Sequence, residues 1–115
     1  MTALLLAVVL ALQPAAPGPW HRERATYYGG SDGYFWQPLA CGGRLTPWTR
    51  GVAMRHARCG RRVEVCHHRR CVVVPVVDRG PWGVPWHIDM TWRTARDLRG
   101  GKAPDSLVIR WRFAR

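Results

Sequence analysis

The stretch VVDRGPWG, residues 76 to 83, ends an apolar run with a single carboxylate, Asp78, and then turns at Gly80-Pro81. An apolar run of this length is typical of a strand, and Gly-Pro is typical of a turn. The sequence therefore predicts a buried strand that presents a carboxylate at its end. Two interpretations stay open here: Asp78 accepts backbone N–H groups of the turn, or it contacts a ligand.

Further short strands surround this stretch. ATYYGG, residues 25 to 30, is a β-branched and aromatic run that ends in a Gly-Gly turn. Residues 61 to 77 predict two strands joined by a four-residue turn. The second is so apolar that we expect it to be covered on both faces, with a bulge or an edge at Pro75. Residues 106 to 113 alternate between apolar and charged side chains, whereas residues 31 to 50 predict a long loop.

A helix is expected between Asp89 and Gly100. Thr91 is a suitable N-cap, and the glycine pair that begins at Gly100 is a suitable stop. Three side chains share one stripe of this helix: Trp92, Ala95 and Leu98. Several short strands with one or two short helices in 115 residues indicate a mainly β fold, a small barrel with a single core.

The four cysteines are an even number in a small domain, which indicates two disulfides. Cys66 and Cys71 flank the predicted turn and are close enough to pair across it, which leaves Cys41 to pair with Cys59. A zinc site is the alternative, because the dipeptide His67-His68 lies between two cysteines. That alternative is weaker, since no C-x-x-C pair is present. We expect no metal and no other cofactor, and we expect both histidines at an exposed hairpin tip.

The chain is strongly basic, with 18 Lys and Arg against 7 Asp and Glu and a net charge of +11; every basic residue except Lys102 is arginine. Such a surface attracts anions over long distances, which fits nucleic acid, an anionic membrane or an anionic cell wall. Residues 2 to 12 are apolar and uncharged but shorter than the roughly 20 residues that span a bilayer. They predict an export signal, with an uncleaved anchor or a buried first element as alternatives.

We therefore expect residues 1 to 19 to form an export signal or anchor with a Pro/Gly linker, and residues 20 to 115 to form one folded domain. An export signal and disulfides together predict a secreted or extracytoplasmic protein.

The order of the motifs resembles that of a known family. ATYYG, ACGGRLT, GVA, CGRRVEV, VVVPVVDRGPWG, HIDMTWRTARDL and LVIRWRF follow one another as in the rare lipoprotein A (RlpA-like) domain, over roughly residues 24 to 113. The same order is similar to that of the first domain of expansins. Its most specific element is the DRGP turn followed eleven residues after Asp78 by Asp89. The resemblance implies a six-stranded double-psi β-barrel that binds or cleaves wall polysaccharide.

The resemblance also implies site residues. In bacterial expansins a threonine of the first strand and two aspartates line the glycan groove, and the matching residues are Thr26, Asp78 and Asp89. RlpA enzymes use in addition a glutamate and a histidine, where this chain has Gly43 and Met54; His56 lies two residues further on. Glycan binding without cleavage is therefore the first functional prediction, and lytic transglycosylation is the alternative.

Lytic transglycosylation needs only one carboxylic acid, because the muramyl 6-hydroxyl attacks its own anomeric carbon. Asp78 is the candidate acid and base, in which role burial or the nearby Asp89 must raise its pKa. Arg79 would oppose this rise if it paired with Asp78, although strand alternation turns it to the other face. Arg79 is also a candidate substrate-binding residue.

Aromatic side chains are the remaining candidates for sugar binding, because sugar rings stack on aromatic planes. Trp82 and Trp86 flank the turn between the two acids, and Tyr28 and Trp48 are weaker candidates. Two further tryptophans are expected in the core: Trp92 and Trp111.

Two other classes of protein remain open. A basic barrel can bind single-stranded nucleic acid, but the export signal and the disulfides argue against it. A secreted module that binds partners without cleaving anything is the third class. We expect a monomer that binds peptidoglycan or a related anionic wall polysaccharide, with no nucleic acid partner and no stable membrane insertion of the mature domain.

Overall fold

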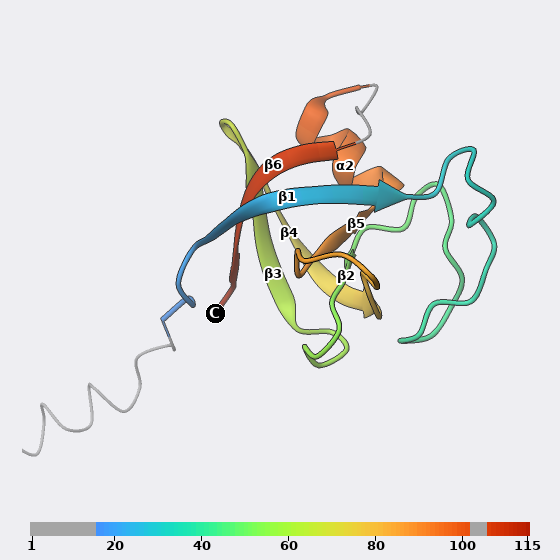
Figure 1. Cartoon of the computed structure of the whole chain (residues 1–115), viewed down its shortest axis with the longest axis horizontal. Coiled ribbons are helices and arrows are strands. Elements are labelled where there is room, and N and C mark those ends of the chain that lie inside the picture. Colours follow the sequence, from blue (N-terminus) through green and yellow to red (C-terminus); the bar gives the residue numbers. More distant parts are fainter. Residues whose placement is uncertain (1–15, 102–105) are drawn as a thin grey trace, which may run out of the picture.

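The computed structural model describes residues 16 to 101 and 106 to 115. In chain order they form β1 (His21–Tyr28), β2 (Val52–Ala53), β3 (Arg62–His67), β4 (Arg70–Asp78), β5 (Asp89–Thr91), α2 (Trp92–Arg99) and β6 (Ser106–Phe113). The strands close into a barrel in the order β1-β5-β2-β4-β3-β6 (Figure 1). The predicted mainly β, six-stranded double-psi barrel is confirmed. Most of the predicted export segment, residues 1 to 15, lies outside the described residues.

Two parallel pairings bring distant segments together at one end of the barrel. β1 pairs with β6 along most of its length, and its last two residues run parallel to β5. β4 pairs with β3 and, at its end, parallel to β2. Ala53 of β2 is thereby the register partner of both Asp78 and Asp89. Residues that are far apart in the sequence therefore meet where β1 and β4 end and β5 begins.

The core fills the inside of this barrel. On β6 the predicted alternation is confirmed, with Leu107, Ile109 and Trp111 buried. On β4 the prediction was wrong: Val74 and Val76 are buried, but Val73 is 46% exposed. Successive side chains of a strand point to opposite faces, and the outer face of β4 is open to solvent at Val73. The apolar run therefore does not make this a strand covered on both faces.

The β3–β4 hairpin is tighter than predicted. Its strands continue through His67 and resume at Arg70, so the connection has two residues instead of four. Cys66 and Cys71 are direct register partners and form a disulfide. His67 is buried rather than exposed, because its ring packs beside β6 with Nδ1 3.0 Å from the carbonyl oxygen of Val108.

The second predicted disulfide, between Cys41 and Cys59, is also present. All four cysteines are therefore paired, and the zinc alternative is wrong. One group of possible metal-binding side chains exists among the described residues, Glu64 with Cys66 and Cys71, and both of its sulfurs are in a disulfide.

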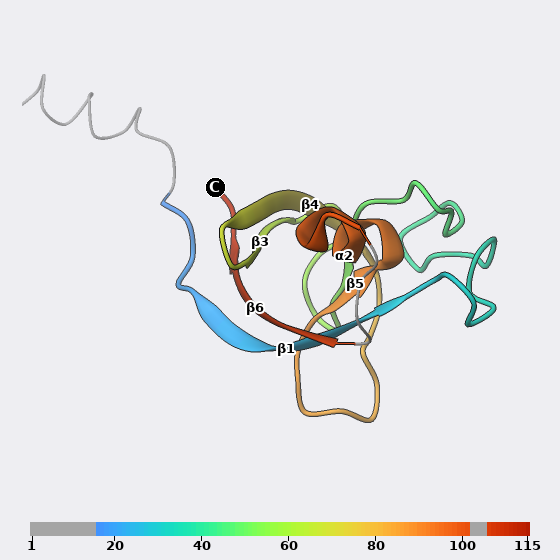
Figure 2. The same cartoon turned by 90° about the horizontal axis from the view of Figure 1, so that it is seen from above.

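Helix α2 has the predicted ends. The hydroxyl of Thr91 accepts the N–H of Thr94 at the start, and Gly100 has the left-handed φ of 70° at the end. The predicted stripe is shifted, however, because Thr94 is buried with Ala95 and Leu98. Trp92 is only half-buried, packed edge-on against Phe35 at 5.9 Å between ring centroids. Figure 2 shows that α2 lies against the outside of the barrel.

β1 begins at His21, four residues earlier than predicted. The polar residues HRER, 21 to 24, gave no strand signal, but they belong to the stretch from His21 to Thr26 that pairs with β6. A search for long, apolar helices in the described part of the chain finds none that could cross a membrane.

Candidate functional site

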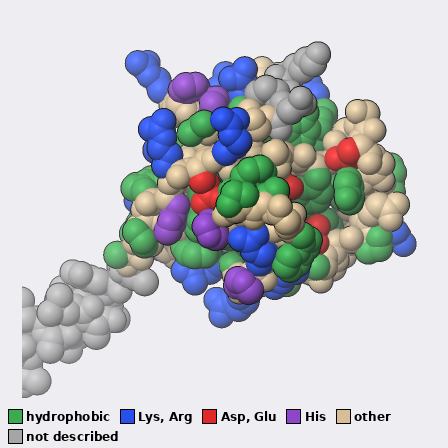
Figure 3. All heavy atoms as spheres, viewed as in Figure 1, with side chains coloured by type: hydrophobic (Ala, Val, Ile, Leu, Met, Phe, Trp, Pro, Cys, Tyr) green, Lys and Arg blue, Asp and Glu red, His purple; other side chains and the backbone are tan. Residues whose placement is uncertain are grey.

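The end of the barrel where β1, β4 and β5 meet is hollowed into a groove of about 550 Å³. Seven of the eight candidate residues line it, with Trp48 the exception: Thr26, Tyr28, Asp78, Arg79, Trp82, Trp86 and Asp89. Topology explains this, since the ends of β1 and β4 and the start of β5 are joined through β2. In Figure 3 red acidic side chains lie among green hydrophobic ones on this face, in contrast to the blue groups around them.

Asp89 is a half-buried carboxyl group at the start of β5. Its Oδ1 accepts hydrogen bonds from Thr26 Oγ1 and from its neighbour Met90 N, both at 3.0 Å. These two bonds favour the charged form, but burial outweighs them and raises the pKa of Asp89 to about 6. The negative charges of Asp32 and Asp78 add to this rise. The site therefore contains a carboxyl group that exchanges its proton near neutral pH.

Asp78 is held by backbone groups. Its Oδ1 accepts the N–H of Arg79 and the N–H of Ala40, both at 2.9 Å. The first of these bonds is the turn interaction that the sequence left open, and the second ties the long loop to the end of β4. Cys41 reinforces that tie, because its N–H donates to Val77 O at 3.1 Å and its sulfur is bonded to Cys59. Asp78 is thus both a structural acceptor and a lining residue of the groove.

Two buried hydrogen-bond donors in the groove have no partner in the described structure: Tyr28 Oη and Trp86 Nε1. Burial, together with the charges of Asp78 and Asp89, raises the pKa of Tyr28 well above its ordinary value, so its hydroxyl keeps its proton. Buried polar groups of folded proteins nearly always have partners. The Asp78 carboxylate acts on the pKa of Tyr28 as a hydrogen-bond acceptor, although the two groups form no hydrogen bond of ordinary geometry, and Trp86 Nε1 has no acceptor among the described residues.

The arginine of the DRGP turn does not pair with the acids. The Arg79 guanidinium lies 3.3 Å from both Met54 O and Cys59 Sγ. Arg79 nevertheless lines the same groove as Asp78, so the predicted turn to the opposite face is not seen, although no ion pair joins the two in the described structure. Trp82, at 69% exposed, offers an open aromatic face at the rim, whereas Trp48 is exposed but lies outside the groove lining.

Asp32 and Tyr34 are among the groove residues that sequence reasoning missed. Asp32 accepts the N–H groups of Gly29 at 2.8 Å and Tyr34 at 3.0 Å, which folds the loop after β1 back over the groove. The signal in the sequence was the turn-forming GGSDG, in which an Asp side chain commonly accepts a nearby backbone N–H. That pattern identifies a turn, but it does not show that the turn faces the two acids.

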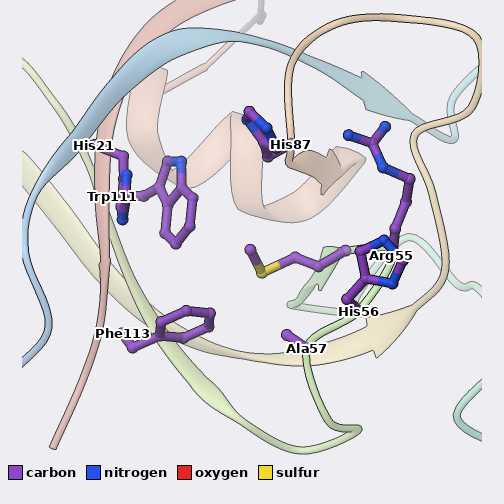
Figure 4. A pocket seen from close by; sticks show the side chains of 8 residues that line it. His21, Arg55, His56, Ala57, His87, Trp111 and Phe113 are labelled. Carbon is purple, nitrogen blue, oxygen red and sulfur yellow. The ribbon is translucent and has the colours of Figure 1, made fainter.

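A second hollow, of about 390 Å³, lies beside the segment that joins β4 to β5 (Figure 4). Trp111 and Phe113 line one side and His56 and His87 another. Met54, at the position of the family histidine, is buried in the core and lines this hollow. Neither Met54 nor His56 lines the groove that contains Asp78 and Asp89.

Fold and site together define a double-psi β-barrel with an acidic, aromatic groove at the end of its parallel strands. No family model matches the chain. The predicted resemblance is confirmed by a curated relative from Nostoc sp., described as a probable endolytic peptidoglycan transglycosylase RlpA, which is 40% identical over 76 residues. The match covers 64% of this chain and 20% of the relative, so the chain spans about one fifth of that protein's length.

Two solved structures share the fold. The Streptomyces papain inhibitor aligns with a TM-score of 0.64 and 26% identity, over 86% of this chain and 97% of the inhibitor. An expansin from Clavibacter michiganensis, solved in complex with cellohexaose, aligns with a TM-score of 0.64 and 21% identity, over 84% of this chain and 51% of the expansin.

Proposed function

We propose that this chain is an extracytoplasmic domain that binds cell-wall polysaccharide, peptidoglycan in particular, in the acidic groove. The observation that carries this proposal is the convergence of Thr26, Asp78 and Asp89 in one groove beside unpartnered donors. The similarity to an RlpA transglycosylase and to an expansin solved with cellohexaose supports the same substrate class. Two disulfides fit an oxidising compartment.

Each kind of groove residue has a role in holding a sugar. Carboxylate oxygens of Asp78 and Asp89 accept hydrogen bonds from sugar hydroxyls. Tyr28 Oη and Trp86 Nε1 donate to ring or hydroxyl oxygens and gain the partners that they lack in the free protein. The open face of Trp82 stacks on the apolar side of a sugar ring.

Lytic transglycosylation is the finer proposal at this site, with Asp89 in place of Asp78 as the acid and base. Protonated Asp89 donates its proton to the glycosidic oxygen while the bond from that oxygen to the anomeric carbon breaks. The muramyl 6-oxygen bonds to the anomeric carbon, and its proton passes to the Asp89 carboxylate. A pKa of about 6 suits both steps. Asp78 stabilises the positive charge that develops on the sugar.

Binding stands before cleavage in this proposal because the groove lacks counterparts of the family glutamate and histidine. Gly43 has no side chain, and Met54 is buried in the core.

The test incubates the full chain with purified peptidoglycan, followed by centrifugation and by mass spectrometry of soluble products. Asp78→Asn and Asp89→Asn are compared with Asp97→Asn, which removes an acid that pairs with Arg50 outside the groove. If the groove binds peptidoglycan, the wild type and Asp97→Asn should sediment with it. Asp78→Asn and Asp89→Asn should stay in the supernatant. Products with 1,6-anhydromuramic ends that vanish in Asp89→Asn would establish cleavage. A wild-type chain that stays in the supernatant would refute the proposal.

A protease inhibitor is the second candidate function. It is favoured by the alignment with the Streptomyces papain inhibitor, which covers nearly all of that protein at 26% identity. Titrating papain with the chain tests it directly. Stoichiometric inhibition without sedimentation on peptidoglycan would replace the polysaccharide proposal with this one.

A further inference from the structure

We propose that the outer face of β1 and β6, up to the tip of the β3–β4 hairpin, is a separate binding site for a linear polymer of phosphodiesters. A hollow of about 420 Å³ lies on this face. Its lining includes four arginines and the two histidines of the hairpin: Arg22, Arg24, Arg99, Arg110, His67 and His68. We call these residues the arginine track. In Figure 3 blue and purple side chains gather around this hairpin tip.

Strand alternation separates the track from the nearest acid. Arg22 and Arg24 are exposed on the outer face of β1, and Glu23 between them points the other way. There Glu23 accepts the indole N–H of Trp111 at 3.0 Å and pairs with His87. The lining of the track contains no carboxylate among the described residues.

Neutral acceptors hold three of the guanidinium groups in position. Arg24 Nη1 donates to Ser106 Oγ at 2.7 Å, and Arg110 Nη2 donates to the carbonyl oxygen of His68 at 3.2 Å. Arg99 Nη1 lies 3.3 Å from Nε2 of the buried His67, whose Nδ1 faces the carbonyl of Val108. A proton on Nδ1 satisfies that carbonyl and leaves Nε2 free to accept from Arg99. These contacts order the side chains without cancelling their charge.

Three arginines outside the track form ion pairs with acids. Arg50 and Arg93 share Asp97, and Arg112 pairs with Glu64. No described ion pair includes an arginine of the track. Within residues 16 to 101 and 106 to 115, three guanidinium groups of the track are therefore held in position by neutral acceptors and have no carboxylate partner, in contrast to the three ion-paired arginines.

The arrangement fits repeated phosphates better than a single anion. A guanidinium binds a phosphate through two parallel N–H groups, a geometry that arginine provides and lysine does not. Residues two apart on a strand are about 6.6 Å apart, so Arg22 and Arg24 match charges that repeat along a chain. We infer a polyol phosphate of the cell surface as the polymer. The choice of a cell-surface polymer rests on the proposed function. The assignment of the arginine track as a phosphate-binding site rests only on the contacts described above.

The experiment measures the affinity of the full chain for fluorescent poly(glycerol phosphate) at several salt concentrations. The track variant replaces Arg24, Arg99 and Arg110 with Gln. The control variant replaces Arg58, Arg62 and Arg115 with Gln. These are exposed arginines outside the track, so the control loses the same three positive charges as the track variant. The track variant should bind at least tenfold more weakly, and its logarithmic salt slope should fall by about 2, at about 0.7 for each lost phosphate contact. The control should stay within about threefold of the wild type.

Equal losses in the two variants would overturn the proposal, because net charge alone would then explain binding. A lysine version of the track variant keeps the charge and should still bind several-fold more weakly than the wild type. An oligonucleotide of equal charge that binds tenfold more tightly than the polyol phosphate would assign the track to nucleic acid instead. Sedimentation with phosphate-free peptidoglycan should be unchanged in the track variant, which separates this result from failure of the acidic groove.

Discussion

Asp89 makes the stability of the protein depend on pH. Its pKa rises from 3.8 to about 6 on folding, so the native state holds this proton more tightly than the unfolded chain does. The stability that this contributes is complete below pH 3.8 and is lost as the pH rises through 6. Asp89→Asn should therefore be more stable than the wild type at pH 7.5, by on the order of 2 kcal/mol, and should lose that advantage at pH 4. Urea unfolding at both pH values measures this; a constant difference would contradict it.

The hydroxyl of Tyr28 should contribute to binding rather than to stability. It is buried and forms no hydrogen bond of ordinary geometry, although the Asp78 carboxylate is near enough to raise its pKa, so its removal should cost the free protein little stability. Tyr28→Phe is expected to melt at the same temperature as the wild type or higher, and to sediment less with peptidoglycan. Trp48→Phe, at an exposed aromatic residue outside the groove lining, is the control. A clear loss of thermal stability in Tyr28→Phe would show that the hydroxyl has a structural partner.

For individual residues, the order of the motifs predicted which side chains meet in the groove, but not which of them keeps a proton. Thr26, Asp78 and Asp89 were identified from the sequence, and all three line the groove. The acid expected to act was Asp78, whereas the acid now proposed is Asp89, whose pKa is raised by burial. That burial comes from tertiary packing around the groove, which no local pattern encodes.

The two disulfides should differ in both stability and function. Cys41–Cys59 spans 18 residues and Cys66–Cys71 spans 5. On the loop-entropy model, their removal costs about 3 and about 2 kcal/mol respectively. Replacing the first pair with alanine also frees the loop whose Ala40 binds Asp78, so we expect reduced sedimentation with peptidoglycan. Replacing the second pair, at the hairpin tip, should leave sedimentation unchanged. Urea unfolding and sedimentation with peptidoglycan are measured for both variants. Equal losses of sedimentation would contradict the expectation that only Cys41–Cys59 supports the groove.

Thr94 connects helix α2 to the barrel through its hydroxyl. Thr94 Oγ1 accepts the N–H of Gly51 at 2.9 Å and donates to the Gly51 carbonyl at 3.1 Å. Thr94→Val keeps the shape but leaves the Gly51 N–H buried and unpaired, at a cost of about 1 to 3 kcal/mol. The Gly51 carbonyl keeps the N–H of Thr91 at 3.1 Å. Thr94→Ser retains the hydroxyl and should lose much less. Thermal unfolding that ranks the serine variant below the valine variant would refute this role.

Local patterns predicted elements well where one face alone is buried. The alternation of β6 and the caps of α2 are present as expected. Local patterns failed where tertiary contacts determine which side chains are buried. The valines of β4 gave no sign of the exposed outer face at Val73, and His67 is buried only because β6 passes beside it.

Binding through the overall positive charge should depend strongly on salt, whereas binding in the groove should not. The net charge of +11 acts over the Debye length, which shrinks from roughly 14 Å at 50 mM to roughly 6 Å at 300 mM salt. Retention on whole anionic walls should therefore fall at least tenfold over this range. Affinity for a neutral chitin oligomer should change less than twofold, because its contacts are short-range hydrogen bonds and stacking. Titration with the oligomer at both salt concentrations measures this, and a parallel fall would mean that the groove contributes little.

The closed barrel itself was predicted from the order of its motifs, not from strand signals alone. β2 is only two residues long, too short for any pattern to identify, yet Ala53 joins the strands that carry both acids. Parallel pairing of β1 with β5 likewise connects residues more than sixty positions apart. Long-range pairings of this kind leave no local trace, so a resemblance over most of the chain was needed to anticipate them.

The contact between Gly18 N and Phe113 O, at 2.9 Å, brings the entry and exit of the barrel side by side. The acidic groove lies at the far end of β1, away from this junction (Figure 1). A short linker across the junction and a cut between His68 and Arg69 would give a circular permutant with every strand pairing intact. The same geometry allows the barrel to be inserted whole into a loop of a carrier protein, with its groove facing outward.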